Sequence, residues 1–222
     1  MTTLPARLDP VSTALLVVDM QNGFCHPQGT LARAGVDVQA PIAVVPNVVR
    51  LVNLCRSAGV RVIWTQQEHR HDDRSKQLHS VPTHLAYLDT RGLTLCGKDD
   101  PDAGILAELQ AVMRREDDVV HKHKFSAFYC TNLETLLRQL GVRTLLVAGV
   151  NTNVCVESTV RDAYARDYDV IVVEECVAGP SQRLHEATLE NVRLYFGAVA
   201  RLEEVASALS APAETSAARS RR

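Results

Sequence analysis

The feature that most constrains the fold is a regular alternation of short apolar runs with stretches of helical spacing. The runs are rich in valine and leucine, as buried parallel strands are. They cover residues 14–19, 60–65, 117–121, 144–148 and 169–173, and a shorter run at 198–202 can form a final strand. Strands that alternate with helices form βαβ units and a parallel sheet covered on both faces. We therefore predict an α/β domain of three layers, α/β/α, around a Rossmann-like parallel sheet of about six strands.

Length and charge narrow the classes of function. A chain of 222 residues is long enough for one domain with a large core. We assign residues 1–206 to this domain and predict a disordered tail, rich in Ala, Ser and Arg, at residues 207–222. The net charge of −2 argues against a nucleic-acid surface. No apolar run approaches the roughly 18 residues of a membrane span, and no signal-peptide pattern is present, so we expect a cytoplasmic protein.

The six cysteines are scattered and form no C-x-x-C pair, so the sequence indicates neither a zinc site nor a disulfide framework. Cys155 stands apart because it lies in the stretch GVNTNVCVE, between an apolar strand and a predicted helix. The free N–H groups and partial positive charge of a helix start favour a thiolate, so we expect a lowered pKa for Cys155. Its position alone fits an inert buried cysteine equally well.

Two further candidates lie at the ends of other predicted strands. Ligands of a doubly wound sheet bind outside the carboxyl ends of its strands, where Asp19, Lys122 and Cys155 can converge. Together they could perform acyl transfer: Asp19 takes the thiol proton, Lys122 supplies positive charge, and Cys155 attacks a carbonyl carbon. We assign the oxyanion hole to the backbone N–H groups of Asn151 and Cys155. Taken singly, Asp19 also fits a metal ligand, a ribose ligand or a cap, and Lys122 also fits a solvated surface residue.

Residues 66–101 show no periodicity. A segment of this length without periodicity is usually a functional lid or an oligomer contact. It carries four of the eight histidines, His69, His71, His79 and His84. We interpret them as scattered surface residues rather than a metal cluster.

Three blocks of the sequence resemble the isochorismatase-like hydrolases. This cysteine hydrolase superfamily includes nicotinamidase, N-carbamoylsarcosine amidohydrolase, biuret hydrolase and ureidoacrylate amidohydrolase. The blocks are LLVVDMQNGF around Asp19, HKHKFSAFYCTNLETLLRQLG beside Lys122, and VAGVNTNVCVESTVRDAYARDYDV around Cys155. The resemblance extends over nearly the whole chain and is closest to the ureidoacrylate, biuret and N-carbamoylsarcosine enzymes.

The resemblance implies a role for each candidate. Asp19 matches the family's general base, Lys122 its lysine and Cys155 its nucleophile. A non-proline cis peptide bond is implied between Val150 and Asn151, and Phe24 matches an aromatic wall of the substrate pocket. The resemblance also implies homo-oligomers, dimers or tetramers, in which a neighbouring chain can complete the site.

Departures from the family pattern narrow the range of expected substrates. Isochorismatases cleave a vinyl ether and lack the nucleophilic cysteine, so Cys155 favours amide chemistry. Nicotinamidases bind a metal through an aspartate and a histidine after the second strand. Here Gln67 replaces that aspartate and His69 follows, so we predict no metal and no cofactor, with Gln67 in contact with substrate instead. We expect a small amide, ureido or carbamoyl substrate; the alternatives are a metal-assisted nicotinamidase-like deamidase and a non-catalytic binding member of the fold.

Overall fold

A six-stranded, all-parallel sheet forms the centre of the protein, which a computed structural model describes for residues 4–69 and 92–211. The strand order is β3-β2-β1-β4-β5-β6. The strands are β1 (Thr13–Val18), β2 (Arg61–Gln67), β3 (Asp118–Lys122), β4 (Thr144–Val150), β5 (Asp169–Ala178) and β6 (Ala198–Ala200). The predicted three-layer α/β/α architecture is therefore confirmed.

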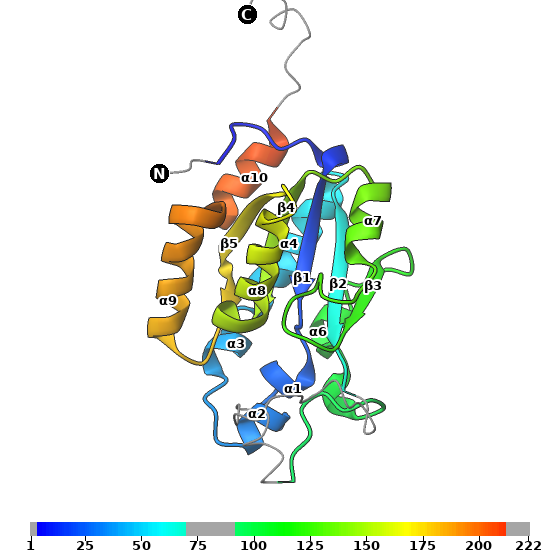
Figure 1. Ribbon diagram of the computed structural model, residues 1–222, viewed down its shortest axis with the longest axis vertical. Helices are drawn as coiled ribbons and strands as arrows, with labels where there is room; N and C mark the ends of the chain where they lie inside the picture. The colour runs from blue at the N-terminus through cyan, green and yellow to red at the C-terminus, as the bar shows by residue number, and fades with distance from the viewer. Residues whose placement is uncertain (1–3, 70–91, 212–222) are drawn as a thin grey trace, which may run out of the picture.

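The central strand β1 is buried along its whole length, because helices cover both faces of the sheet. On one face Leu15 and Val17 pack in a cluster with α4 (Val45–Ser57) and α10 (Leu202–Ser210). On the other face Leu16 packs in a second cluster, and Figure 1 shows the helices of that face in front of the sheet. These helices are α7 (Leu133–Gln139), α8 (Glu157–Tyr164) and α9 (Gln182–Asn191).

Short elements close the two ends of the molecule. Near the carboxyl ends of the strands lie α1 (Asn22–Cys25), α2 (Thr30–Arg33), α3 (Gln39–Ala43), the 3-10 turn η2 (Pro101–Ala103) and α6 (Ala107–Gln110). Two π-helical turns, η3 (Thr152–Val156) and η4 (Val192–Phe196), precede α8 and follow α9. None of the described helices is long and apolar enough to cross a membrane.

Several boundaries differ from those expected from the sequence. Strand β2 continues through Gln67, so the segment expected to be irregular from residue 66 begins later, and residues 70–91 of it lie outside the described residues. Helix α10 extends to Ser210, beyond the predicted domain limit at residue 206, because Val205 and Leu209 are buried in the core. Residues 212–222 of the predicted tail lie outside the described residues.

Strand β4 approaches β1 closely just before the candidate site. At Gly149 the backbone φ is +116°, and a Cβ atom there would lie 2.0 Å from the carbonyl oxygen of Val18. Only glycine adopts this conformation at so close an approach. Gly149 therefore allows the segment that carries Cys155 to leave the sheet directly beside the end of β1.

Candidate active site

The structure brings Asp19, Lys122 and Cys155 together at the carboxyl edge of the sheet. Asp19 follows β1, Lys122 ends β3, and Cys155 lies in the π-helical turn η3 after β4. The ammonium Nζ of Lys122 lies 2.6 Å from Asp19 Oδ2 and 3.5 Å from Cys155 Sγ. The exposed fractions are 0% for Asp19 and Lys122 and 3% for Cys155. This edge of the sheet therefore holds an acid, a cation and a thiol in contact and away from solvent.

Asp19 is held by a partner that the sequence did not reveal. Its φ of +49° is in the left-handed region, which costs a non-glycine residue on the order of 1 kcal/mol. The buried hydroxyl of Thr65, on the neighbouring strand β2, accepts the Asp19 N–H at 3.1 Å and donates to Asp19 Oδ1 at 2.6 Å. Thr65 thus stabilises the backbone conformation and orients the carboxylate.

Lys122 is surrounded by acceptors. Besides Asp19 and Cys155, its Nζ donates to Gln67 Oε1 and to the carbonyl oxygen of Lys124, each at 3.0 Å. Burial disfavours the charged amine, but the charges of Asp19 and Cys155 and their hydrogen bonds outweigh it, so the pKa of Lys122 is raised. Lys122 therefore remains an ammonium ion that balances the Asp19 carboxylate.

The predicted lowering of the Cys155 pKa is wrong, because the structure buries this thiol. Burial raises the pKa of this thiol, Lys122 acts in the opposite direction, and Asp19 adds to the increase. The turn η3 places Cys155 before α8, which begins only at Glu157, and inside the protein rather than at an exposed helix start. Desolvation therefore dominates, and the resting group is a thiol beside a carboxylate.

The turn that carries Cys155 begins with an unusual peptide bond. The bond between Val150 and Asn151 is cis, although neither residue is proline. The N–H groups of Val154 and Val156 both donate to the Asn151 carbonyl oxygen, at 2.9 and 3.3 Å. Cys155 lies within this turn. The oxyanion role of the Asn151 and Cys155 N–H groups stays a prediction.

Gln67 lies inside the site and is oriented at both ends. Its Oε1 accepts from Lys122 and lies 3.5 Å from Cys155 Sγ, while its Nε2 lies 2.8 Å from His69 Nε2. The side chain of Gln21 bonds both the N–H and the carbonyl oxygen of Gln67, each at 2.8 Å. The interpretation of His69 as a surface residue is wrong, because it is 1% exposed; His71, His79 and His84 lie outside the described residues.

The side chains at and beside Gln67 do not suit the binding of a metal ion. An amide N–H directed at His69 Nε2 occupies the lone pair that a metal would need, and Gln67 supplies no carboxylate. Among the described residues, no group of three or more His, Cys, Asp or Glu side chains could hold a metal ion. Phe24 is buried in α1, within the apolar cluster on the α4 face, and its contact with substrate stays a prediction.

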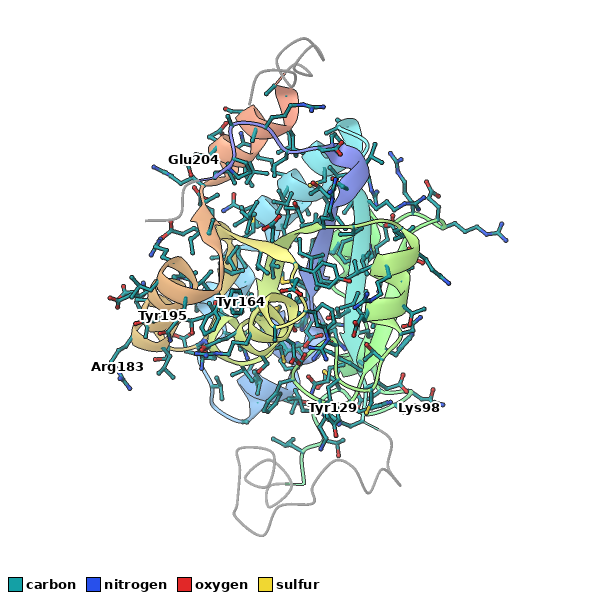
Figure 2. All side chains as sticks on the ribbon, turned by 45° about the horizontal axis from the view of Figure 1, so that its top comes forward. Lys98, Tyr129, Tyr164, Arg183, Tyr195 and Glu204 are labelled. Atoms are coloured by element: carbon teal, nitrogen blue, oxygen red, sulfur yellow. The ribbon has the colours of Figure 1, made fainter. Side chains whose placement is uncertain are left out.

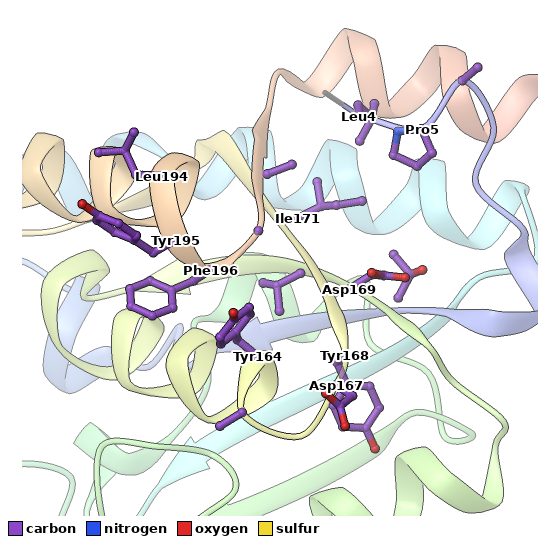
Figure 3. Close-up of a pocket in the computed structure, with 16 residues that line it drawn as sticks. Leu4, Pro5, Tyr164, Asp167, Tyr168, Asp169, Ile171, Leu194, Tyr195 and Phe196 are labelled. Atoms are coloured by element: carbon purple, nitrogen blue, oxygen red, sulfur yellow. The ribbon is translucent and has the colours of Figure 1, made fainter. Parts of the chain in front are cut away.

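A groove lies at the opposite edge of the sheet, where the strands begin. Its volume is about 1100 Å³. Figure 3 shows the aromatic and acidic side chains that line it, among them Tyr164, Asp169 and Tyr195. It opens beside the first residues of β4, β5 and β6, whereas the three candidate residues lie at or beyond the last residues of their strands. In Figure 2 Tyr164 and Tyr195 lie together on one side, away from Lys98 and Tyr129.

Comparison with known proteins supplies independent information. A family model of the isochorismatase domain matches residues 13–204. The ureidoacrylate amidohydrolase RutB of Methylobacterium radiotolerans is 36% identical over 224 residues, covering 96% of this chain and 85% of the relative. RutB of Enterobacter sp. (strain 638) is 36% identical over 230 residues, covering 96% and 97%.

Solved structures agree with these relatives. A cysteine hydrolase from Pseudomonas syringae pv. phaseolicola superimposes with a TM-score of 0.81 at 28% identity, covering 94% of this chain and 96% of the other. An N-carbamoylsarcosine amidase from Thermoplasma acidophilum has a TM-score of 0.66 at 26% identity, with 86% and 96% covered. The similarity therefore extends over almost the whole domain.

Proposed function

Because the chain belongs to the isochorismatase family, we propose that Asp19, Lys122 and Cys155 cleave the C–N bond of a small amide, ureido or carbamoyl compound. The protein is an amidohydrolase, a hydrolase of linear amides. The observation that carries the catalytic assignment is the buried contact of the three side chains, with Lys122 Nζ 2.6 Å from Asp19 and 3.5 Å from Cys155. A buried acid, cation and thiol in contact are the groups that a thioester mechanism needs.

The first half of the reaction forms a thioester. Asp19 accepts the proton of the Cys155 thiol, and the resulting thiolate attacks the substrate carbonyl carbon. The oxyanion of the tetrahedral intermediate receives hydrogen bonds from the N–H groups of Asn151 and Cys155. Asp19 then returns the proton to the leaving nitrogen, and ammonia or an amine departs as the C–N bond breaks.

The second half regenerates the enzyme. Water adds to the thioester while Asp19 accepts one of its protons, and the C–S bond breaks as the proton returns to sulfur. Lys122 stays charged throughout, because its ammonium group offsets the negative charge that moves between Asp19 and Cys155. The raised pKa of Cys155 makes the base necessary, since little thiolate exists before Asp19 acts.

The relatives and Gln67 both support the proposed substrate class. Two of the similar proteins are named after ureidoacrylate and N-carbamoylsarcosine. Each of these compounds carries a carbamoyl nitrogen, which supports a ureido or carbamoyl substrate. An amide at position 67 in place of a carboxylate does not favour a metal-assisted deamidase. We place Phe24 and Gln67 at the substrate.

Assembly and location complete the proposal. We infer a homo-oligomer, because Tyr164, Leu194 and Tyr195 are 52 to 64% exposed on one surface, and such apolar patches commonly mark protein interfaces. All six cysteines are free, which fits the reducing cytoplasm. Light scattering coupled to size-exclusion chromatography tests the assembly, and a monomer at micromolar concentration would exclude it.

Ammonia release tests the reaction. Purified protein is incubated with biuret, ureidoacrylate, N-carbamoyl amino acids, nicotinamide or maleamate, with and without a chelator, beside a Cys155→Ala control. We expect release from a ureido or carbamoyl compound that a chelator does not change and that the control lacks. Release that requires metal would support the nicotinamidase-like alternative, and a fully active Cys155→Ala variant would overturn the thioester mechanism.

A further inference from the structure

The hydroxyl of Thr159 links the segment that carries Cys155 to the segment that carries Lys122. Thr159 is fully buried in α8. Its Oγ1 donates to the Cys155 carbonyl oxygen at 2.7 Å and accepts the N–H of Ala127 at 3.0 Å. We propose that Thr159 is a positioning residue that sets the separation of the Cys155 thiol and the Lys122 ammonium group. This inference rests on the proposed function of the same site.

The contacts form a closed ring through the site. Lys122 Nζ donates to the carbonyl oxygen of Lys124, and the chain continues from there to Ala127. From Ala127 the ring passes through the Thr159 hydroxyl to the backbone of Cys155, and the 3.5 Å distance from Cys155 Sγ to Lys122 Nζ closes it. Within this ring Thr159 supplies the side-chain bridge between two segments that otherwise belong to different βα connections.

A threonine that bonds the carbonyl four residues earlier is common in helices and needs no special explanation. The second bond is different, because Ala127 is 32 residues away in sequence and is fully buried. Without the hydroxyl, the buried Ala127 N–H would lose its acceptor, and buried N–H groups move to find another. The loop after β3 would then shift relative to η3.

A shift of this kind acts on chemistry more than on binding. Lys122 lowers the pKa of Cys155 against the effect of burial, so a longer distance between them removes part of that support. Reacting groups displaced by about 1 Å lose on the order of 10²-fold in rate. Phe24 and Gln67, which we assign to the substrate, lie on other elements, α1 and β2, and Gln21 holds the backbone of Gln67. We therefore expect the loss mainly in kcat.

The experiment compares three variants with the wild type. Thr159→Val removes the hydroxyl and keeps the shape, and Thr159→Ser keeps the hydroxyl. Thr13→Val is the matched control, because Thr13 is equally buried in β1 and its Oγ1 has no hydrogen-bond partner among the described residues. For each variant we measure kcat and KM, and we follow iodoacetamide labelling of Cys155 against pH by mass spectrometry, with exposed Cys130 as internal reference.

We expect Thr159→Val to lower kcat roughly 10- to 100-fold with unchanged KM, and to shift the labelling midpoint of Cys155 to higher pH. Thr159→Ser restores most of the turnover, and Thr13→Val leaves both measurements unchanged. If Thr159→Val does not fold, Thr159→Ala provides the same comparison against Thr159→Ser.

Two results would overturn the proposal. In one, Thr159→Val keeps its kcat and labelling profile; in the other, Thr159→Ser is as impaired as Thr159→Val, which would assign the effect to the methyl group. If the wild type releases no ammonia from any compound, the proposed function fails on its own. The labelling midpoint still decides the role of Thr159.

Discussion

The candidate site at one edge of the sheet and the groove at the other edge differ in how much solvent reaches their polar side chains. At the carboxyl edge Asp19 and Lys122 are sealed from solvent, and each has partners within hydrogen-bond distance. At the amino edge a groove of about 1100 Å³ is open, and Tyr195 on its wall is 64% exposed. This groove is therefore not where Asp19, Lys122 and Cys155 meet.

Buried charge locates the candidate site better than empty volume does. Transferring an ion pair into a protein interior costs several kcal/mol per ion, which geometry and further hydrogen bonds must offset. At the carboxyl edge, hydrogen bonds from Thr65 to Asp19 and from Lys122 to Gln67 help to offset this cost. In the groove at the amino edge, Asp169 is exposed and its charge remains in contact with solvent.

The largest effect is expected at Cys155, the proposed nucleophile. Cys155→Ala should reduce amide hydrolysis by at least roughly 10³-fold, because the thioester cannot form. Ammonia release under saturating substrate measures the loss. Cys130→Ala, at an exposed cysteine, is the control and should keep full activity. If the two variants hydrolyse the substrate at similar rates, the buried Cys155 is no more important for the reaction than the exposed Cys130.

Neutralising Lys122 should reduce both activity and stability. Lys122→Met leaves the Asp19 carboxylate buried without its cation, which typically costs about 3–5 kcal/mol of unfolding free energy. Arg138→Met is the matched control, because the Arg138–Glu134 pair is exposed and solvent screens such pairs, so they contribute little to stability. Urea denaturation measures both variants, and equal losses would contradict the assigned difference between buried and exposed pairs.

Removal of the Thr65 hydroxyl should have an intermediate effect. Thr65→Val deletes a hydrogen bond to a charged group, worth about 1.5–3 kcal/mol, and frees Asp19 to leave its left-handed conformation. We expect kcat to fall roughly 10- to 100-fold while the fold survives. Steady-state kinetics with circular dichroism provides the check. Wild-type kcat in this variant would show that Lys122 alone orients the carboxylate.

The pH dependence of labelling separates the sealed thiol from an exposed one. A raised pKa means less thiolate at a given pH, so Cys155 should react with iodoacetamide more slowly than Cys130 near neutral pH. Its rate should still be rising above pH 9, and Lys122→Met should move the rise further upward. Mass spectrometry of the two peptides follows the rates. A Cys155 midpoint below the ordinary thiol value would restore the expectation of a lowered pKa.

The smallest effect on turnover is expected at the groove. Tyr195→Ser and Leu194→Ser change exposed side chains far from Cys155, so kcat per chain should stay within about twofold of wild type, as for most surface substitutions. Elution volume should instead increase if this surface joins two copies. A large loss of kcat without any change in assembly would link the amino edge to the chemistry.

The strand positions and the three candidate residues could be predicted because they depend on local pattern. Apolar runs identify the strands, and parallel strands all end at one edge, so a residue after each run is near the others. The roles of Thr65 and Thr159 were not predicted, for the opposite reason. Each bonds a group that is distant in sequence, Asp19 for Thr65 and Ala127 for Thr159, 46 and 32 residues away.

The sequence by itself determined the alternation of strands and helices, the edge at which Asp19, Lys122 and Cys155 meet, and the absence of a carboxylate at position 67. The tertiary structure decided how those groups are charged. A helix start predicts a lowered pKa for Cys155, but burial raises it, because desolvation depends on every chain segment that covers the thiol. Local spacing specifies which residues approach one another; only the packed protein specifies how much water reaches them.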